Sequence, residues 1–238
     1  MKKTTSVILI IFLFFLSIIS CSNNTNTGET SDNFNIGYNI LDDNQTEKNN
    51  TVINAVESES LLILVNKENK LPDDYAVNLT TIENHKISTV LVDNLKEMQE
   101  AAEKDNIYVQ ISDAYRTRAA QEQAFDSTVN NFVNNGNSYD IAVERAKGLA
   151  APPGYSEHET GLAIDFTTNG TYDEKLEMWD WLSRNAYKYG FILLYPKGKE
   201  DITGYDYEAW HYRYVGKDHA EKIFDSNTVL EEYLSTLQ

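Results

Sequence analysis

The sequence predicts an α+β fold: a single domain with a small, mostly antiparallel sheet flanked by helices. Three observations carry this prediction. Runs typical of strands are short and few. They lie among longer stretches whose apolar residues recur at helical spacing. Hydrophobic residues make up 41% of the 238, and 15 Tyr, 9 Phe and 3 Trp supply large side chains for a core. The length suits one domain with appendages, or at most two small domains.

The elements follow from spacing and from capping residues. In order, we expect a helix over about 89–104, a strand over 107–111, helices over about 117–133 and 138–150, a strand over 162–166, a helix over about 171–190, and strands over 191–195 and 210–215.

The first helix and strand are predicted by periodicity. Leu91, Leu95, Met98 and Ala102 recur at helical spacing, and Asn106 is expected to end the helix. Apolar and polar residues then alternate, which favours a strand. For the next two helices, Thr117 and Ser138 are side chains of the type that cap helix N-termini. The two prolines at 152–153, followed by a glycine, predict the loop after them.

The second half begins with a strand, followed by a helix with a recognisable start. Thr171 and Glu174 match the capping-box pattern, and Gly190 is expected to end this helix. The residues expected to face the core are Leu176, Trp179, Leu182 and Ala186.

The first twenty residues have the pattern of an export signal. Lys2 and Lys3 precede an apolar run from Val7 to Ile19, which is short for a membrane span. The residues that end at Cys21 resemble a bacterial lipobox, which implies cleavage before Cys21 and a lipid on its thiol. An ordinary secretory signal, or a retained anchor with a chance cysteine, are the alternatives.

The domain boundaries are set by this signal and by composition. We expect a lipoprotein signal peptide at 1–20, a flexible polar tether at 21–57, rich in Asn, Thr and Ser, and the folded domain at 58–238. Lipid on Cys21 would hold the protein outside the cytoplasm, on the outer face of the bacterial cell membrane. We expect a monomer.

Charge and cysteine content exclude some functions. The net charge of −17 disfavours binding to nucleic acid and an electrostatic grip on anionic lipid. Cys21 is the only cysteine, so the chain forms no internal disulfide and no cysteine-based zinc site. Any metal must be held by His, Asp or Glu.

The most informative segment runs from Ser156 to Asp165. On a strand, Asp165 faces away from the core residues on either side of it, and Gly161 lets the chain turn so that His158 can fold over the same face. With His211 this gives two histidines and one aspartate, the composition of a catalytic zinc site with an open position. Taken singly, each of the three residues is more often structural.

Two further groups complete the candidate site. Glu208 is a candidate general base, but on a regular strand it and His211 would point to opposite faces, so this role requires a turn between them. Arg116 lies where a strand passes into a helix, and Gln121 follows one turn later. The guanidinium could clamp a carboxylate, stabilise an oxyanion, or form an ordinary surface ion pair.

Together these segments resemble the VanY-type D-alanyl-D-alanine carboxypeptidases of the LAS metallopeptidase group. The family pattern is S-x-H-x-x-G-x-A-x-D, then E-x-W-H, with Y-R-[ST] and a glutamine upstream. This sequence matches the pattern, and the similarity covers about 60–225. Its matching residues are Tyr115, Arg116, Thr117, Gln121, Ser156, His158, Gly161, Ala163, Asp165, Glu208, Trp210 and His211. One departure is Asp113-Ala114, where family members often carry Ser-Gly or Ser-Ala.

The resemblance implies an LAS, hedgehog-like fold and a zinc-dependent D,D-carboxypeptidase that removes the terminal D-alanine from peptidoglycan stem peptides. It implies that His158, Asp165 and His211 bind one Zn²⁺ and that Glu208 is the base. The substrate-binding residues it implies are Arg116, Gln121, Ser156, Tyr115 and Trp210.

Three rival functions remain open. The enzyme could be an L,D-carboxypeptidase or an endopeptidase on the same zinc site. A non-catalytic zinc lipoprotein that binds wall peptides is a rival of another class, which has no need of Glu208. The simplest rival is a merely structural polar network, which predicts no stoichiometric metal.

Overall fold

A computed structural model describes residues 61–237. Within this part the strands are β1 (Leu79–Ile82), β2 (His85–Ser88), β3 (Gln110–Asp113), β4 (Ala163–Thr167), β5 (Phe191–Leu193) and β6 (His211–Tyr214). The helices are α2 (Val92–Lys104), α3 (Arg118–Asn134), α4 (Tyr139–Ala146), α5 (Tyr172–Asn185), α6 (Glu200–Thr203), α7 (Lys217–Asp225) and α8 (Leu230–Thr236). Short 3-10 turns cover Thr89–Leu91, Glu157–Thr160 and Ala186–Tyr189.

The central sheet has four strands in the order β3-β4-β6-β5, and every neighbouring pair is antiparallel. β1 and β2 form a separate antiparallel hairpin. The expected α+β fold with a small antiparallel sheet is therefore confirmed. Because β4 and β6 are the inner strands, residues on them have neighbours on both sides, which fixes their side chains firmly.

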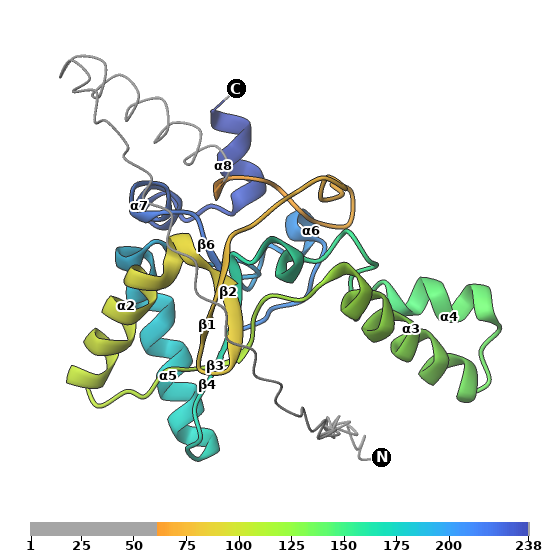
Figure 1. Ribbon diagram of the computed structural model, residues 1–238, viewed down its shortest axis with the longest axis horizontal. Helices are drawn as coiled ribbons and strands as arrows, with labels where there is room; N and C mark the ends of the chain where they lie inside the picture. The colour runs from red at the N-terminus through yellow and green to blue at the C-terminus, as the bar shows by residue number, and fades with distance from the viewer. Residues whose placement is uncertain (1–60, 238) are drawn as a thin grey trace, which may run out of the picture. The chain divides into compact units, whose positions relative to one another are not determined.

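One face of the sheet is covered by α2 and α5, which lie side by side in Figure 1. From the strands, Ile164, Phe166, Tyr212 and Tyr214 enter this core, and each is at most 5% exposed. Leu91, Leu95, Met98 and Ala102 all lie in this core cluster, as their spacing predicted. This layer is the main core of the domain.

A second apolar cluster forms around β5 and the last two helices, where Val215, Ile223 and Leu230 are buried. Leu62 and Leu64, from the apolar run at the start of the described chain, pack against it. That run is not a strand, because it lies outside both sheets. The α3–α4 hairpin has a small cluster of its own and projects from the rest of the domain (Figure 1).

Several predicted boundaries and one face need correction. The strand expected at 107–111 lies at Gln110–Asp113, because the chain leaves α2 through Asn106 in the left-handed region (φ 61°) before it joins β4. The helix expected to reach 150 ends at Ala146 and continues only as turns. Leu176 is 44% exposed, because α5 turns Met178 and Trp181 inward instead.

Two of the three N-terminal capping predictions are confirmed, whereas Ser138 stands at the N-terminus of α4 without a capping hydrogen bond from its side chain. Thr171 and Glu174 form the expected capping box, and the Thr117 hydroxyl accepts a hydrogen bond from the Ala120 amide at the start of α3. The hairpin of β1 and β2 was not predicted, since Glu83 and Asn84 take positive φ without a glycine signal.

The signal peptide at 1–20, the tether at 21–57 and Cys21 lie outside the described residues. Across residues 61–237, every helix is too short or too polar to cross a membrane.

Candidate active site

The sheet face opposite the main core carries the candidate metal ligands. Asp165 on β4 lies directly opposite His211 on β6, so the antiparallel register itself places the two side chains together. His158 comes from the 3-10 turn that precedes β4, and Gly161 at φ 72° reverses the chain between them. One ligand atom from each of the three residues lies within 4.8 Å of the other two.

The distances suit a single zinc ion. Asp165 Oδ1 is 2.8 Å from His211 Nδ1 and 3.6 Å from His158 Nε2. When two ligand atoms each lie ~2.0–2.1 Å from a tetrahedral zinc ion, they are roughly 3.3 Å from each other. The two distances from Asp165 lie on either side of this separation. Two imidazoles and one carboxylate also form a known catalytic donor set with a position left for water. The residues present therefore fit one Zn²⁺ ion.

His158 is already arranged as a ligand. Its Nδ1 lies 2.7 Å from the carbonyl oxygen of Ala114, which only accepts, so Nδ1 carries the proton and Nε2 keeps a free lone pair toward Asp165. Burial lowers the pKa of His158, against the opposing charge of Asp165. The imidazole is therefore neutral at neutral pH, as a zinc ligand must be.

His211 is held differently. Its Nδ1 faces Asp165, while Nε2 is buried without a hydrogen-bond partner among the described residues. Burial alone would lower the pKa of His211, but the hydrogen bond to Asp165 and the charges of Asp165 and Glu208 raise it. The ring of Tyr195 stacks on His211 with centroids 4.9 Å apart and fixes its plane. Zinc must displace a proton from this histidine.

Asp165 stays ionised despite its burial. Desolvation pushes its pKa up, but the neighbouring His158, the hydrogen bond from His211 and the charge of Arg116 together bring it below the usual value. A permanently charged carboxylate between two imidazoles favours a divalent cation.

Glu208 lies beside this cluster because the chain turns before β6. The His211 amide donates to the Glu208 carbonyl at 3.2 Å, and this is the turn that the base role required. Glu208 Oε2 is 3.9 Å from His211 Nδ1. Burial raises the pKa of Glu208, and the nearby Asp165 adds to the shift while His211 opposes it. A carboxylate with a raised pKa accepts a proton more readily near neutral pH.

Arg116 lies at the edge of the cluster in a fixed orientation. Its amide donates to the His158 carbonyl at 3.1 Å, its guanidinium forms an ion pair with Asp113, and Nη1 donates to Gln121 Oε1 at 2.5 Å. Gln121 is buried and donates in turn to the Ala151 carbonyl at 2.6 Å. Asp113, which departs from the family pattern, is thus the partner of Arg116.

The remaining predicted residues are placed less directly. Ser156 is buried at the start of the 3-10 turn that carries His158. The indole of Trp210 is 38% exposed and leans on Trp179, with centroids 6.1 Å apart. Tyr115 lines a neighbouring hollow together with Tyr75. No hydrogen bond in residues 61–237 joins these three side chains to the cluster.

Sequence reasoning missed two ion pairs that flank His158, one of them fully buried and the other partly exposed. Glu157 pairs with Arg213, which is fully buried, and Glu159 pairs with Arg118 at 3.0 Å. Charged residues next to a motif give no signal of burial in a single sequence. His219 on α7 is partly buried, and its Nδ1 lies 2.7 Å from the Tyr233 hydroxyl.

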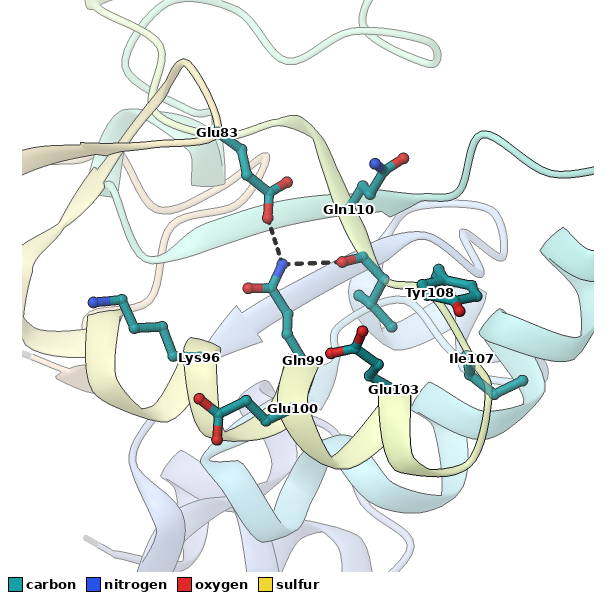
Figure 2. A pocket seen from close by; sticks show the side chains of 9 residues that line it. Glu83, Lys96, Gln99, Glu100, Glu103, Ile107, Tyr108 and Gln110 are labelled. Carbon is teal, nitrogen blue, oxygen red and sulfur yellow. Dashed lines mark hydrogen bonds between the residues drawn. The ribbon is translucent and has the colours of Figure 1, made fainter.

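A polar hollow between α2 and β3 is unrelated to this site (Figure 2). Its central side chain, Gln99, donates to Glu83 at 2.6 Å and to the Val109 carbonyl at 3.0 Å. Glu83 in turn accepts from the Ile111 amide at 2.9 Å. These bonds hold the tip of the β1–β2 hairpin to the sheet, which is a structural role.

Comparison with known proteins gives consistent matches. Residues 84–217 match the VanY family, described as D-alanyl-D-alanine carboxypeptidase. A D-alanyl-D-alanine carboxypeptidase of Enterococcus faecalis is 39% identical over 181 residues, which cover 76% of this chain and 68% of that protein.

Two solved structures extend the likeness to the fold. The vancomycin-resistance D,D-pentapeptidase VanY, solved as a mutant in complex with Zn(II), has a TM-score of 0.69 and 38% identity, covering 74% of this chain and 99% of that chain. The LD-carboxypeptidase LdcB, whose structure addresses peptidoglycan recognition, has a TM-score of 0.65 and 37% identity, covering 75% and 87%.

Proposed function

The chain belongs to the VanY family of D-alanyl-D-alanine carboxypeptidases, and on this premise we propose how its own residues divide the reaction among them. It is a zinc peptidase that removes the C-terminal D-alanine from peptidoglycan stem peptides. The single observation that carries this function is the convergence of His158, Asp165 and His211, with ligand atoms within 4.8 Å of one another, beside Glu208.

The three convergent residues hold the metal. His158 offers Nε2, His211 offers Nδ1, and Asp165 offers a carboxylate oxygen whose charge offsets part of the ion's charge. Zinc bound there supplies a Lewis acid that lowers the pKa of water and polarises a carbonyl. The Ala114 carbonyl keeps His158 in the ligating tautomer.

Glu208 acts as the general base and acid. Its carboxylate takes a proton from the attacking water and delivers it to the amine of the leaving D-alanine. Its raised pKa suits it to both transfers, and the turn before β6 holds it beside His211.

Arg116 binds the free carboxylate at the end of the substrate. A planar guanidinium pairs with a carboxylate through two parallel hydrogen bonds, and Asp113 and Gln121 fix its plane. This requirement for a terminal carboxylate makes the enzyme an exopeptidase. Ser156, Tyr115 and Trp210 complete the substrate site.

The location of the substrate supports the proposed anchor. Stem peptides lie outside the cytoplasmic membrane, where an export signal at 1–20 and a lipid on Cys21 would deliver the domain. The polar residues at 21–57 give the domain reach, and it acts as a monomer.

The test is release of D-alanine from defined stems by Glu208→Ala. We expect hydrolysis to fall by at least the ~10²–10⁴-fold that general base catalysis contributes. Zinc stoichiometry should stay at that of the wild type, because Glu208 is not a ligand. Glu177→Gln, on the exposed side of α5, is the matched control and should keep full activity.

The same assay separates the rivals. Pentapeptide stems lose D-alanine to a D,D-carboxypeptidase, whereas tetrapeptide stems lose it to an L,D-carboxypeptidase such as LdcB. Cleavage of a cross-bridge without a free carboxylate would indicate an endopeptidase. Full activity of Glu208→Ala would contradict the base role, and zinc binding without any hydrolysis by the wild type would favour a wall-peptide binder.

A further inference from the structure

The strongest feature outside the catalytic set is the buried ion pair between Glu157 and Arg213. Arg213 is fully buried on β6, and Glu157 is 3% exposed. Nη1 of Arg213 donates to Glu157 Oε1 at 2.8 Å and to Oε2 at 2.5 Å. A buried pair of this kind is weak evidence for stability, because desolvation cancels much of the attraction. Its location therefore suggests another role.

Both partners adjoin metal ligands in the chain. Glu157 precedes His158 in the same 3-10 turn, and Arg213 lies two residues after His211 on β6. Because side chains alternate along a strand, Arg213 shares the face of the sheet that carries His211. Arg213 also lies opposite Ala163, whose small side chain leaves room over this part of the face. The pair thus joins the turn of one histidine to the strand of the other.

Arg213 also reaches the start of the folded chain. Its Nη2 donates to the carbonyl oxygens of Leu61 and Ile63 at 2.9 and 2.8 Å, across about 150 residues of sequence. Its Nε donates to the carbonyl of Tyr214. Every nitrogen of the guanidinium is used, so its plane is fixed.

We propose that Glu157 and Arg213 are positioning residues for the zinc site: the pair holds His158 and His211 at the spacing that one ion requires, braced by the backbone of residues 61–63. This inference rests on the proposed zinc site. Groups that orient metal ligands without touching the metal typically change metal affinity by ~10–100-fold when they are removed. Glu157 and Arg213 would act through the backbone of the turn and of the strand that carry the two histidines.

The primary variant is Arg213→Lys. Lysine keeps the charge, but one ammonium cannot reproduce a planar fork that bonds a carboxylate and two carbonyls. We expect the zinc dissociation constant, measured by chelator competition on folded protein, to rise by ~10–100-fold. At saturating zinc, kcat for D-alanine release should fall while KM changes little, because Arg116 is untouched.

A matched surface pair serves as the control. Arg184 and Asp180 form an i,i+4 ion pair on α5, and both are largely exposed. Arg184→Lys should leave zinc affinity and kcat at wild-type values. If Arg213→Lys does not fold, Glu157→Gln decides, since it keeps the shape and one acceptor oxygen while weakening the hold on Arg213.

The outcomes separate the claims. A folded variant that is less thermostable yet binds zinc as tightly as the wild type overturns the positioning role and leaves the proposed function intact. A wild-type protein that binds no zinc overturns both. Weaker zinc binding in Arg213→Lys or Glu157→Gln, with the Arg184→Lys control unchanged, supports the positioning role.

Discussion

The two faces of the central sheet differ in what their side chains do, although they share the same strands. On one face Ile164, Phe166 and Tyr212 are packed under α2 and α5. On the other, Asp165 and His211 lie with His158, their ligand atoms within 4.8 Å of one another. Neighbouring residues of one strand thus serve stability and chemistry separately.

The difference shows that the face with Asp165 and His211 is held by polar contacts, whereas the other face is held by apolar packing. The Ala114 carbonyl accepts from His158, the Tyr195 ring stacks on His211, and the buried Glu157–Arg213 pair has the positioning role proposed above. Such contacts specify geometry, whereas the apolar face supplies most of the free energy of burial. Changes on the two faces should therefore separate in experiments.

The largest effect is expected for Asp165→Asn. Asparagine keeps the size but loses the negative charge that offsets the charge of the metal. Zinc affinity should therefore fall by more than the ~10–100-fold expected when a residue that only orients a ligand is changed, and hydrolysis should be lost. Calorimetric zinc titration and D-alanine release measure both. A variant that retains zinc and activity would contradict the assignment of Asp165 as a ligand.

The neighbouring change Phe166→Ala should act on stability instead. Removing a buried aromatic ring should lower the free energy of unfolding by about 3–5 kcal/mol. Denaturant unfolding measures it, and the folded fraction should bind zinc normally. Leu176→Ala is the control, expected within about 0.5 kcal/mol of the wild type, because Leu176 is exposed. Equal losses of unfolding free energy in Phe166→Ala and Leu176→Ala would contradict the view that the packed face of the sheet supplies the stability.

Arg116→Lys tests the substrate side of the polar face. Losing a bidentate hydrogen bond to a carboxylate costs about 1.5–3 kcal/mol, or roughly 10–100-fold in kcat/KM. Zinc affinity should change far less than in Asp165→Asn. Kinetics on a stem peptide and on its C-terminal amide distinguish the roles, since only the free acid should lose rate. Loss on both substrates would favour oxyanion stabilisation.

The mildest test is pH. The pKa of His211 is raised above its usual value, and that of His158 is lowered. As pH falls through the raised pKa, His211 takes a proton that zinc must displace, so zinc affinity should fall by about tenfold per pH unit. Below the lowered pKa of His158, a second proton should steepen the slope. Histidine side chains usually change charge between about pH 5 and 8. A zinc affinity that does not change over this pH range would contradict this account.

Much of the site could be predicted because its residues lie in short local patterns. The segment from His158 to Asp165 contains its own turn at Gly161 and its own alternation, so local geometry made these two residues candidate ligands. His211 was added as a third candidate, and the family resemblance supported all three. The antiparallel register of β4 and β6 supplies the physical reason, since it places His211 opposite Asp165.

The parts that were missed depend on distant contacts. The bond between Arg213 and Leu61 spans 152 positions, and no local pattern reveals it. The inward face of α5 was misjudged at Leu176 because several apolar residues of this helix could form the buried stripe, and in the structure Met178 and Trp181 are the ones that enter the main core. The Arg213 bond and the buried face of α5 both depend on contacts between residues far apart in the sequence.

The central claim is that one zinc ion is bound by side chains from β4, β6 and the turn before β4. Anomalous diffraction at the zinc edge, from crystals grown with zinc, tests it most directly. We expect a single strong peak about 2.0–2.2 Å from His158 Nε2, an Asp165 carboxylate oxygen and His211 Nδ1. A protein without such a peak, or with its zinc bound elsewhere, would contradict the account.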